Sequence, residues 1–326
     1  MRRQAKLMLK LTLQDISIIG NGIQRPECVL ATRAGYLFCS DSRGGYNIIN
    51  PDGQSSFIEA IGVPDDLLPN GIALLPNRDI LAANLADSSG VWRINRDGQA
   101  CLFLDEADGI KLPPVNFVGL DHCDRLWISV STRAVPRHQS FRNGVADGFI
   151  AVHDQGATRI VADDIAFTNE SIVDPSGAWL YVNETIGQCT SRYPISAEAS
   201  LGPRELVAEY PPGTFPDGLT FDADGRVWIV SVASNRIICV DRGGKQTVVF
   251  EDADEQEMEV LNAAFDRGEI VRDMIEIGVT RSSGNIASIA FGGSNLQTIY
   301  LGSLSHNGIQ KFSSPIKGVR PVHWKF

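Results

Sequence analysis

The stretch Thr214-Phe-Pro-Asp-Gly-Leu-Thr-Phe-Asp-Ala-Asp-Gly-Arg-Val-Trp-Ile-Val230 decides the fold of this chain. It places Asp217 on a Pro-Asp-Gly turn, and an alternating apolar stretch with Leu219 and Phe221 follows. An Asp-Ala-Asp-Gly turn then leads into a second apolar stretch around Trp228. Apolar alternation with a period of two, bounded by Asp and Gly, predicts two short strands joined as a hairpin.

The same unit recurs along the chain. The centres of its second strand are Phe38, Leu81, Trp127, Leu180, Trp228 and Ile299. These centres are 43, 46, 53, 48 and 71 residues apart, so four intervals match one unit of four short strands and the fifth holds a unit plus an insertion. Regular short strands with little helical periodicity are typical of an array that closes radially and protects its strand edges. We predict an all-β fold, a six-bladed β-propeller that forms a single domain over residues 1–326.

Three segments depart from the regular unit. The stretch from Leu11 to Ile19 is expected to complete the last blade, whose other strands lie between Ala287 and Phe312. Residues 251–278 carry apolar side chains at helical spacing among acids, which predicts a helical insertion that is a lid, an interface or a surface excursion. The long loop 131–148 is a place where a rigid scaffold tends to carry binding residues.

Composition and charge exclude several classes of protein. Hydrophobic residues make up 43% of the chain and charged residues 21%, which is globular composition. The formal net charge of −10 argues against a nucleic acid or an anionic membrane surface as partner. We expect a small-molecule substrate, with the chain a monomer or a homo-oligomer. The six scattered cysteines are interpreted as reduced core thiols. The basic N-terminus lacks the apolar run of a signal peptide, so the cytoplasm is the expected location.

Oxygen-bearing side chains recur at one phase of the repeat, in the segments that lead into the predicted inner strands. They are Glu27, Asn70, Asn116, Asn169 and Asp217. In a propeller such segments converge on one mouth of the central channel. An all-oxygen set suits a hard divalent cation such as Ca²⁺, Mg²⁺ or Mn²⁺. Asn or Asp before Gly is also an ordinary turn former, and the pattern leaves that alternative open.

These phased positions, with Leu180-Tyr-Val-Asn-Glu-Thr185 and Ala290-Phe-Gly-Gly-Ser-Asn-Leu-Gln-Thr-Ile-Tyr300, give the chain a family resemblance. It resembles the senescence marker protein/gluconolactonase/luciferin-regenerating-enzyme family of six-bladed propellers, over roughly Gln24 to Tyr300. The resemblance implies one divalent metal ion, Ca²⁺ foremost with Mg²⁺, Mn²⁺ or Zn²⁺ as alternatives. It implies Glu27, Asn169 and Asp217 as metal ligands, Asn116 near metal and substrate, and Asp217 as general base in hydrolysis of a lactone.

The neighbours of these positions differ from the family pattern. Phe117 follows Asn116, Glu170 follows Asn169 where Gly is usual, and Cys28 follows Glu27 where Gly is usual. We expect these changes to make the mouth more apolar near Phe117 and more acidic near Glu170, which argues against an aldonolactone. Phe117 and Glu170 are therefore predicted to contact the substrate, and Asn70 and Arg133 are further candidates. Arg133 is one of several basic residues of the long loop, with Arg137, His138 and Arg142.

Other catalytic classes are less well supported. No Gly-x-Ser-x-Gly sequence is present, which disfavours a serine hydrolase, and no His pair has zinc-site spacing. Two alternatives to a lactonase stay open: a metal-dependent isomerase or lyase that uses the same site, and a calcium-binding propeller without catalysis.

Overall fold

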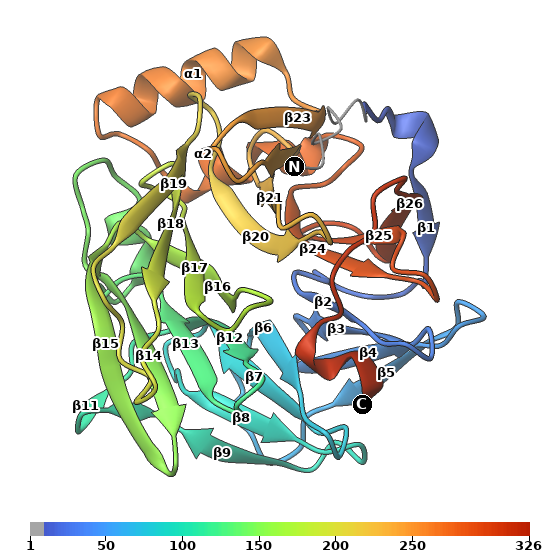
Figure 1. Ribbon diagram of the computed structural model, residues 1–326, viewed down its shortest axis with the longest axis vertical. Helices are drawn as coiled ribbons and strands as arrows, with labels where there is room; N and C mark the ends of the chain where they lie inside the picture. The colour runs from blue at the N-terminus through green and yellow to red at the C-terminus, as the bar shows by residue number, and fades with distance from the viewer. Residues whose placement is uncertain (1–9) are drawn as a thin grey trace.

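The computed structural model describes residues 10–326. Within them, six four-stranded antiparallel sheets surround a central axis, which confirms the predicted six-bladed β-propeller (Figure 1). The first blade holds β2 (Val29–Ala31), β3 (Leu37–Asp41), β4 (Gly45–Ile49) and β5 (Ser55–Glu59), and the second holds β6 (Pro69–Leu74), β7 (Ile80–Asn84), β8 (Val91–Ile94) and β9 (Ala100–Leu104). The third holds β12 (Val115–Leu120), β13 (Leu126–Val130), β14 (Gly148–Asp154) and β15 (Ala157–Ile165), and the fourth holds β16 (Thr168–Val173), β17 (Trp179–Glu184), β18 (Cys189–Pro194) and β19 (Glu205–Glu209). The fifth holds β20 (Pro216–Phe221), β21 (Val227–Ser231), β22 (Arg236–Val240) and β23 (Gln246–Phe250), and the sixth begins with β24 (Ile286–Gly292), β25 (Thr298–Ser303) and β26 (Ile309–Ser313). A small ribbon of β10 (Glu106–Ala107) and β11 (Ile110–Lys111) precedes the third blade.

The sixth blade is completed from the N-terminal side of the chain, as predicted. Strand β1 (Ser17–Ile19) pairs with β26 in antiparallel register, with Ser17 opposite Lys311 and Ile19 opposite Ile309. This pairing joins the two ends of the propeller, so the ring closes by backbone hydrogen bonds rather than by side-chain packing alone (Figure 1). The prediction from the basic N-terminus concerned mainly residues 1–9, which lie outside the described residues. No helix of the described part is long and apolar enough to cross a membrane.

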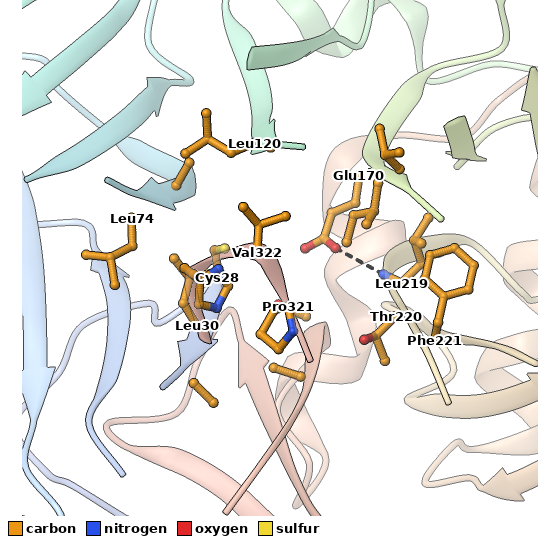
Figure 2. A pocket seen from close by; sticks show the side chains of 18 of the residues that line it. Cys28, Leu30, Leu74, Leu120, Glu170, Leu219, Thr220, Phe221, Pro321 and Val322 are labelled. Carbon is orange, nitrogen blue, oxygen red and sulfur yellow. Dashed lines mark hydrogen bonds between the residues drawn. The ribbon is translucent and has the colours of Figure 1, made fainter. Parts of the chain in front are cut away.

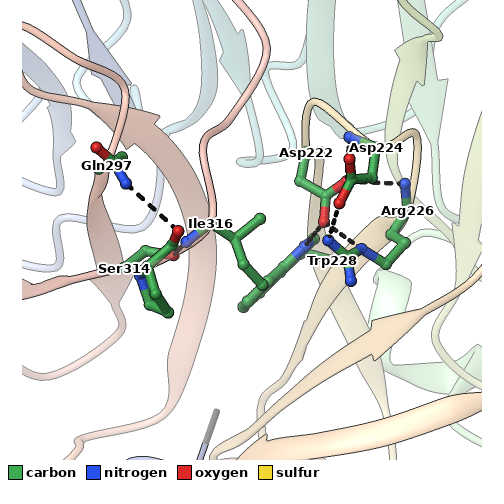
Figure 3. Close-up of polar contacts among 8 residues, drawn as sticks. Asp222, Asp224, Arg226, Trp228, Gln297, Ser314 and Ile316 are labelled. Atoms are coloured by element: carbon green, nitrogen blue, oxygen red, sulfur yellow. Dashed lines mark hydrogen bonds and ion pairs between the residues drawn. The ribbon is translucent and has the colours of Figure 1, made fainter. Parts of the chain in front are cut away.

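The turns between inner strands are held by buried aspartates. The carboxylate of Asp222 accepts hydrogen bonds from the backbone N–H groups of Asp224 and Arg226, from Arg226 Nε at 2.7 Å and from Trp228 Nε1 at 2.9 Å (Figure 3). Asp121 occupies the same place in the third blade and binds Arg125 and Trp127 in the same way. The Asp, Arg and Trp that recur in the third and fifth blades thus lock these two hairpins to the strand that follows each of them.

The insertion before the last blade is helical. Residues 251–278 contain α1 (Glu255–Asp266), α2 (Arg272–Ile275) and the first part of a 3-10 turn, η3 (Glu276–Thr280). Helix α1 starts at Asp254, whose carboxylate accepts hydrogen bonds from the N–H groups of Gln256 and Glu257. Its buried face, including Met258 and Leu261, packs in one cluster with Phe215 from the fifth blade. The insertion therefore rests on the mouth of the channel at which the inner strands begin.

The C-terminal segment covers the other mouth. Val319 N–H donates to the Phe221 carbonyl, and Arg33 N–H donates to the Trp324 carbonyl, so the segment bridges the inner hairpins of the fifth and first blades. Beneath it lies a mostly apolar cavity of about 130 Å³, in which Pro321 and Val322 face Leu30 and Leu74 (Figure 2). The repeat pattern did not reveal this covering segment, because it follows the last blade and carries no strand signal.

The six cysteines are all free in the structure. Cys28, Cys39, Cys189 and Cys239 are buried, as the sequence indicated, but Cys101 and Cys123 are exposed. The prediction of core thiols is wrong for these two, because Cys101 lies on the outermost strand of its blade and Cys123 lies in a hairpin turn.

His323 in the C-terminal segment makes the protein's stability sensitive to acid. Burial lowers the pKa of His323 to about 4, and its Nε2 atom is enclosed without a hydrogen-bond partner within the described residues. In the unfolded chain the His323 imidazole binds a proton near pH 6.5, whereas in the folded protein it stays neutral until about pH 4. The free energy of unfolding is therefore unaffected by His323 above pH 6.5 and falls as the pH drops towards 4. We expect this protonation to lower the free energy of unfolding by about 3 kcal/mol at pH 4. Urea unfolding of His323→Gln should show a smaller acid-induced loss than the wild type and exposed His138→Gln; equal losses in all three would contradict the prediction.

Candidate active site at the mouth of the channel

The phased polar residues lie at the start of the inner strands, and irregular backbone aims them inward. Asn70, Asn116, Asn169 and Asp217 are each the second residue of an inner strand. The strand register shifts at each of the four. Such bulges turn a side chain away from its regular direction and are common beside functional sites. Glu27 precedes β2, and the sixth inner strand carries Ala287 at the matching place.

The expected Pro-Asp-Gly turn is a strand. Asp217 and Gly218 lie inside β20, and Asn70 and Gly71 lie inside β6. The two glycines are needed because the inner strand of the next blade packs closely against them. A Cβ at Gly71 would lie 2.5 Å from Phe117 Cδ2, and one at Gly218 would lie 2.6 Å from Ser288 Cα. Asn-Gly and Asp-Gly are read as turns from local propensity, which neighbouring inner strands override here.

All five phased residues line one cavity of about 70 Å³. The structure thus brings Glu27, Asn70, Asn116, Asn169 and Asp217 together from five blades, and each is at least 94% buried. Ligand and substrate roles stay predictions, but the shared location that the phase of the repeat indicated is present in the structure.

Hydrogen bonds orient the three amides. Asn70 Nδ2 donates to Glu27 Oε1 and to the Asn116 carbonyl, both at 2.9 Å. Asn116 Nδ2 donates to Ser131 Oγ, and Asn169 Nδ2 donates to Thr185 Oγ1, also at 2.9 Å. Since the amide nitrogens are engaged, the Oδ1 atoms of Asn70 and Asn169 remain as acceptors.

Several oxygens of the cavity are buried without any hydrogen-bond partner among the described residues. They are Glu27 Oε2, Asn70 Oδ1, Asn169 Oδ1 and Asp217 Oδ1. A buried acceptor without a donor is costly, so a group that binds oxygens is needed to complete the site. Within the described residues no three His, Cys, Asp or Glu side chains gather closely enough to hold a metal ion, so a cation here depends on amide oxygen as well as on Glu27 and Asp217. Two carboxylates and amide oxygens are a donor set that fits a hard divalent cation.

Without a cation, the charged forms of the Glu27 and Asp217 carboxylates are unfavourable in the folded protein. Burial raises the pKa of Glu27 to about 7, while Arg25 and the hydrogen bond from Asn70 oppose the rise. Burial, and next the charge of Glu27, raise the pKa of Asp217 well above its usual range. A bound divalent cation would reverse this direction, because opposite charge favours the carboxylate form.

Two arginines of the cavity are not among the substrate contacts predicted from the sequence. Arg25 precedes Glu27 by two residues, and Arg137 begins the short turn η2 (Arg137–Ser140) in the long loop. Burial lowers the pKa of Arg137 to about 10. The sequence marked the loop arginines as a group and could not rank them, because only the folded loop decides which of them turns inward.

Much of the remaining wall is apolar, although Thr185 and Glu276 also line the cavity. Phe141, Phe167, Val232 and Leu304 line the cavity, and Ile275 of α2 joins them. Helix α2 also contributes Arg272 at the rim. The inserted helical segment is therefore part of the site wall, which the sequence had left open.

Sequence comparison places these residues in a family. The family model described as SMP-30/Gluconolactonase/LRE-like region matches residues 25–253, well over half of the chain. The chain belongs to this family. The matched region contains the five phased residues of the cavity together with Arg25 and Arg137. Helices α1 and α2 and strands β24, β25 and β26 of the sixth blade lie beyond its end.

Known relatives include enzymes that act on lactones. A 6-deoxy-6-sulfogluconolactonase from Pseudomonas putida is 24% identical over 303 residues, covering 92% of this chain and 88% of the relative. A solved gluconolactonase from Xanthomonas campestris is 16% identical with a TM-score of 0.67, covering 92% of this chain and 89% of that one. A calcium-binding protein, regucalcin from Agrobacterium tumefaciens, is 15% identical with a TM-score of 0.66, covering 93% of each chain. The two structures show the shared propeller fold.

Three of the predicted substrate contacts lie outside the cavity that Glu27, Asn169 and Asp217 line. Arg133 is exposed and forms two 2.8 Å bonds with Asp163, while its guanidinium lies over the Phe149 ring. Phe117 and Glu170 line the other cavity, under the C-terminal segment, and Figure 2 shows the Glu170 carboxylate directed at the Leu219 N–H. Neighbouring residues of a strand point to opposite sides, so the residue after a site residue faces away from the site. The expected apolar and acidic changes thus belong to the opposite end of the channel.

Proposed function

We propose that this chain is a divalent-cation-dependent hydrolase that opens a lactone or a related cyclic ester. The proposal is carried by one observation: Glu27, Asn169 and Asp217 each present to the same cavity a buried oxygen that has no hydrogen-bond partner within residues 10–326. Membership of a family that includes gluconolactonases supports the same reaction class. Ca²⁺ is the proposed cation, since it accepts carboxylate and amide oxygens in irregular geometry; Mg²⁺, Mn²⁺ and Zn²⁺ are alternatives.

The residues divide the work between binding and proton transfer. A divalent cation bound by Glu27, Asn169 and Asp217 would polarise the carbonyl of the substrate and favour negative charge on its oxygen. Asp217 accepts the proton of the attacking water as general base. Asn183 Nδ2 donates to the Asp217 carbonyl at 2.8 Å, which fixes the backbone that carries this carboxylate. Asn116 and Asn70, tied to each other and to Glu27, orient the substrate.

The first test is removal of the cation. Purified protein is offered a panel of γ- and δ-lactones, and proton release is recorded with and without a chelator. Release that the chelator abolishes and Ca²⁺ restores is the expected result. Substrate conversion without the mass gain of one water would replace the hydrolase with an isomerase or lyase, and cation binding without turnover would leave a calcium-binding propeller.

Cation binding should also stabilise the fold. We expect Ca²⁺ at about 100 times its Kd to raise the free energy of unfolding by about 3 kcal/mol. Glu27→Gln should lose this gain, because a ligand charge is removed. Glu170→Gln is the matched control: Glu170 is an equally buried carboxylic acid that lines the other cavity, and its variant should respond to Ca²⁺ as the wild type does. A lost response in Glu170→Gln with a retained response in Glu27→Gln would overturn the ligand assignment.

A further inference from the structure

We propose that Arg25 and Arg137 form an anion-binding subsite beside the cation ligands, and that the substrate is a lactone bearing an anionic oxyacid group, a carboxylate or a sulfonate. The lactone part of this inference rests on the proposed function. The anion subsite itself follows from the arginines and can be tested without turnover.

Both arginines carry donors that nothing in the described residues satisfies. Arg25 Nη1 and Arg137 Nε are buried and have no hydrogen-bond partner there. Neither guanidinium takes part in an ion pair within the described residues. A buried N–H donor of a guanidinium without an acceptor is unfavourable, so these two donors call for an anionic partner that enters the cavity.

The structure constrains the backbone of Arg25 and the side chain of Arg137 before any ligand arrives. Arg25 has a φ of 51°, in the left-handed region that residues other than Gly rarely adopt. Such backbone persists where the surroundings enforce it, and it is concentrated at functional sites. Arg137 Nη2 donates to Ser131 Oγ at 2.9 Å, and its guanidinium lies 4.9 Å from the centre of the Phe167 ring. A guanidinium that is stacked and hydrogen-bonded loses little further freedom when it binds an oxyanion.

The charges of the cavity favour an anion once the cation is bound. A divalent cation offsets the charges of Glu27 and Asp217, which leaves Arg25 and Arg137 uncompensated. Arg272 adds a third guanidinium at the rim, although it is exposed and paired with Glu276 at 2.7 Å. The bland alternative is that Arg25 and Arg137 only balance the two carboxylates. The arginines do act on Glu27 and Asp217 through space. No direct ion pair joins these groups within the described residues, so guanidinium donors remain for a ligand.

Shape adds a second requirement on the ligand. The apolar wall made by Phe141, Phe167 and Ile275 shares the cavity with the arginines and the carboxylates. A compact substrate with an ester ring at the Asp217 side and an oxyacid group at the Arg137 side matches this arrangement. A neutral, hydroxyl-rich sugar lactone would offer both guanidinium groups only uncharged acceptors, which form weaker hydrogen bonds than an oxyanion does.

The experiment compares lactones that differ only in charge. Three γ-lactones carry a carboxylate, a sulfonatomethyl group or a neutral carboxamide at the same ring carbon. For the wild type with Ca²⁺ we expect at least one anionic lactone to exceed the carboxamide in kcat/KM by about 10- to 100-fold, the range of a hydrogen bond to a charged group. In Arg137→Gln and Arg25→Gln the ratio should collapse towards one. Arg133→Gln, from the same loop but outside the cavity, should keep the wild-type ratio.

A binding measurement separates this inference from the proposed function. Calorimetry with 2-hydroxyglutarate, the ring-opened product of the carboxylate lactone, requires no turnover. Binding that weakens about 10- to 100-fold in Arg137→Gln and Arg25→Gln but not in Arg133→Gln supports the subsite even if no lactone is hydrolysed. Hydrolysis of the carboxamide with no preference for either anionic lactone would overturn the subsite and leave the lactonase standing. Melting curves of the variants show whether each is folded.

Discussion

Asp217→Asn is expected to lower kcat for lactone hydrolysis by about 10²- to 10⁴-fold, the usual contribution of a general base. The amide keeps the size of the carboxylate but cannot accept a proton at neutral pH, and it is a weaker cation ligand. Steady-state proton release on the best lactone of the panel measures the effect. Retained turnover would remove Asp217 from the proposed mechanism.

The same variant should fold at least as well as the wild type without cation. Burial raises the pKa of Asp217 well above its usual range, so the folded protein resists the charged carboxylate. A neutral amide at this position therefore removes an unfavourable charge. We expect melting temperatures in chelator that are equal to or higher than those of the wild type. A strongly lowered melting temperature would mean that the activity loss reports misfolding, and exposed Asp224→Asn provides the control for full activity.

Asp222→Ala is expected to lower the free energy of unfolding by about 3 to 5 kcal/mol, the typical result of leaving a buried charge without its partner. Asp222 is fully buried and accepts four hydrogen bonds, two of them from Arg226 (Figure 3). Its removal leaves the 9% exposed Arg226 side chain and the Trp228 Nε1 donor short of an acceptor. Urea unfolding at neutral pH gives the difference directly.

A neighbouring carboxylate supplies the matched control for this loss. Asp224 also pairs with Arg226, but its side chain is 67% exposed. Asp224→Asn should therefore change the free energy of unfolding by less than about 1 kcal/mol, as exposed ion pairs do. Asp121→Ala, at the same place in the third blade, should reproduce the large loss. Small effects in both buried variants would show that these aspartates do not lock the hairpins.

The two mouths of the channel have different characters in the structure. At the start of the inner strands, the cavity is lined by Glu27, Asp217 and arginines and is walled in part by α2. At their ends, the cavity is mostly apolar and lies under the C-terminal segment (Figure 2). The sequence placed Phe117 and Glu170 at the first mouth, and the structure places them at the second.

The sequence by itself determined the propeller, its blade number and the closing strand. These follow from short-range physics: alternating apolar residues, Asp and Gly at turns, and a repeat that cannot bury its faces without neighbours. The same repeat phase picked out the five cavity residues, because equivalent positions of equivalent blades must converge on one axis. The local structure predicted for these positions was wrong, because Asp217 and Asn70 lie on bulged strands and not on turns.

Only the tertiary structure decided which arginine enters the cavity, what walls it and which way the residues after the ligand positions face. Arg133 and Arg137 are indistinguishable by pattern, yet one pairs with Asp163 at the surface and the other stacks on Phe167, in the connection between the third and fourth blades. Helix α2 reaches the site from an insertion that the repeat does not describe. These outcomes depend on contacts between segments that are distant in the chain. Such contacts form only when the blades close into a ring, and local propensity carries no information about them.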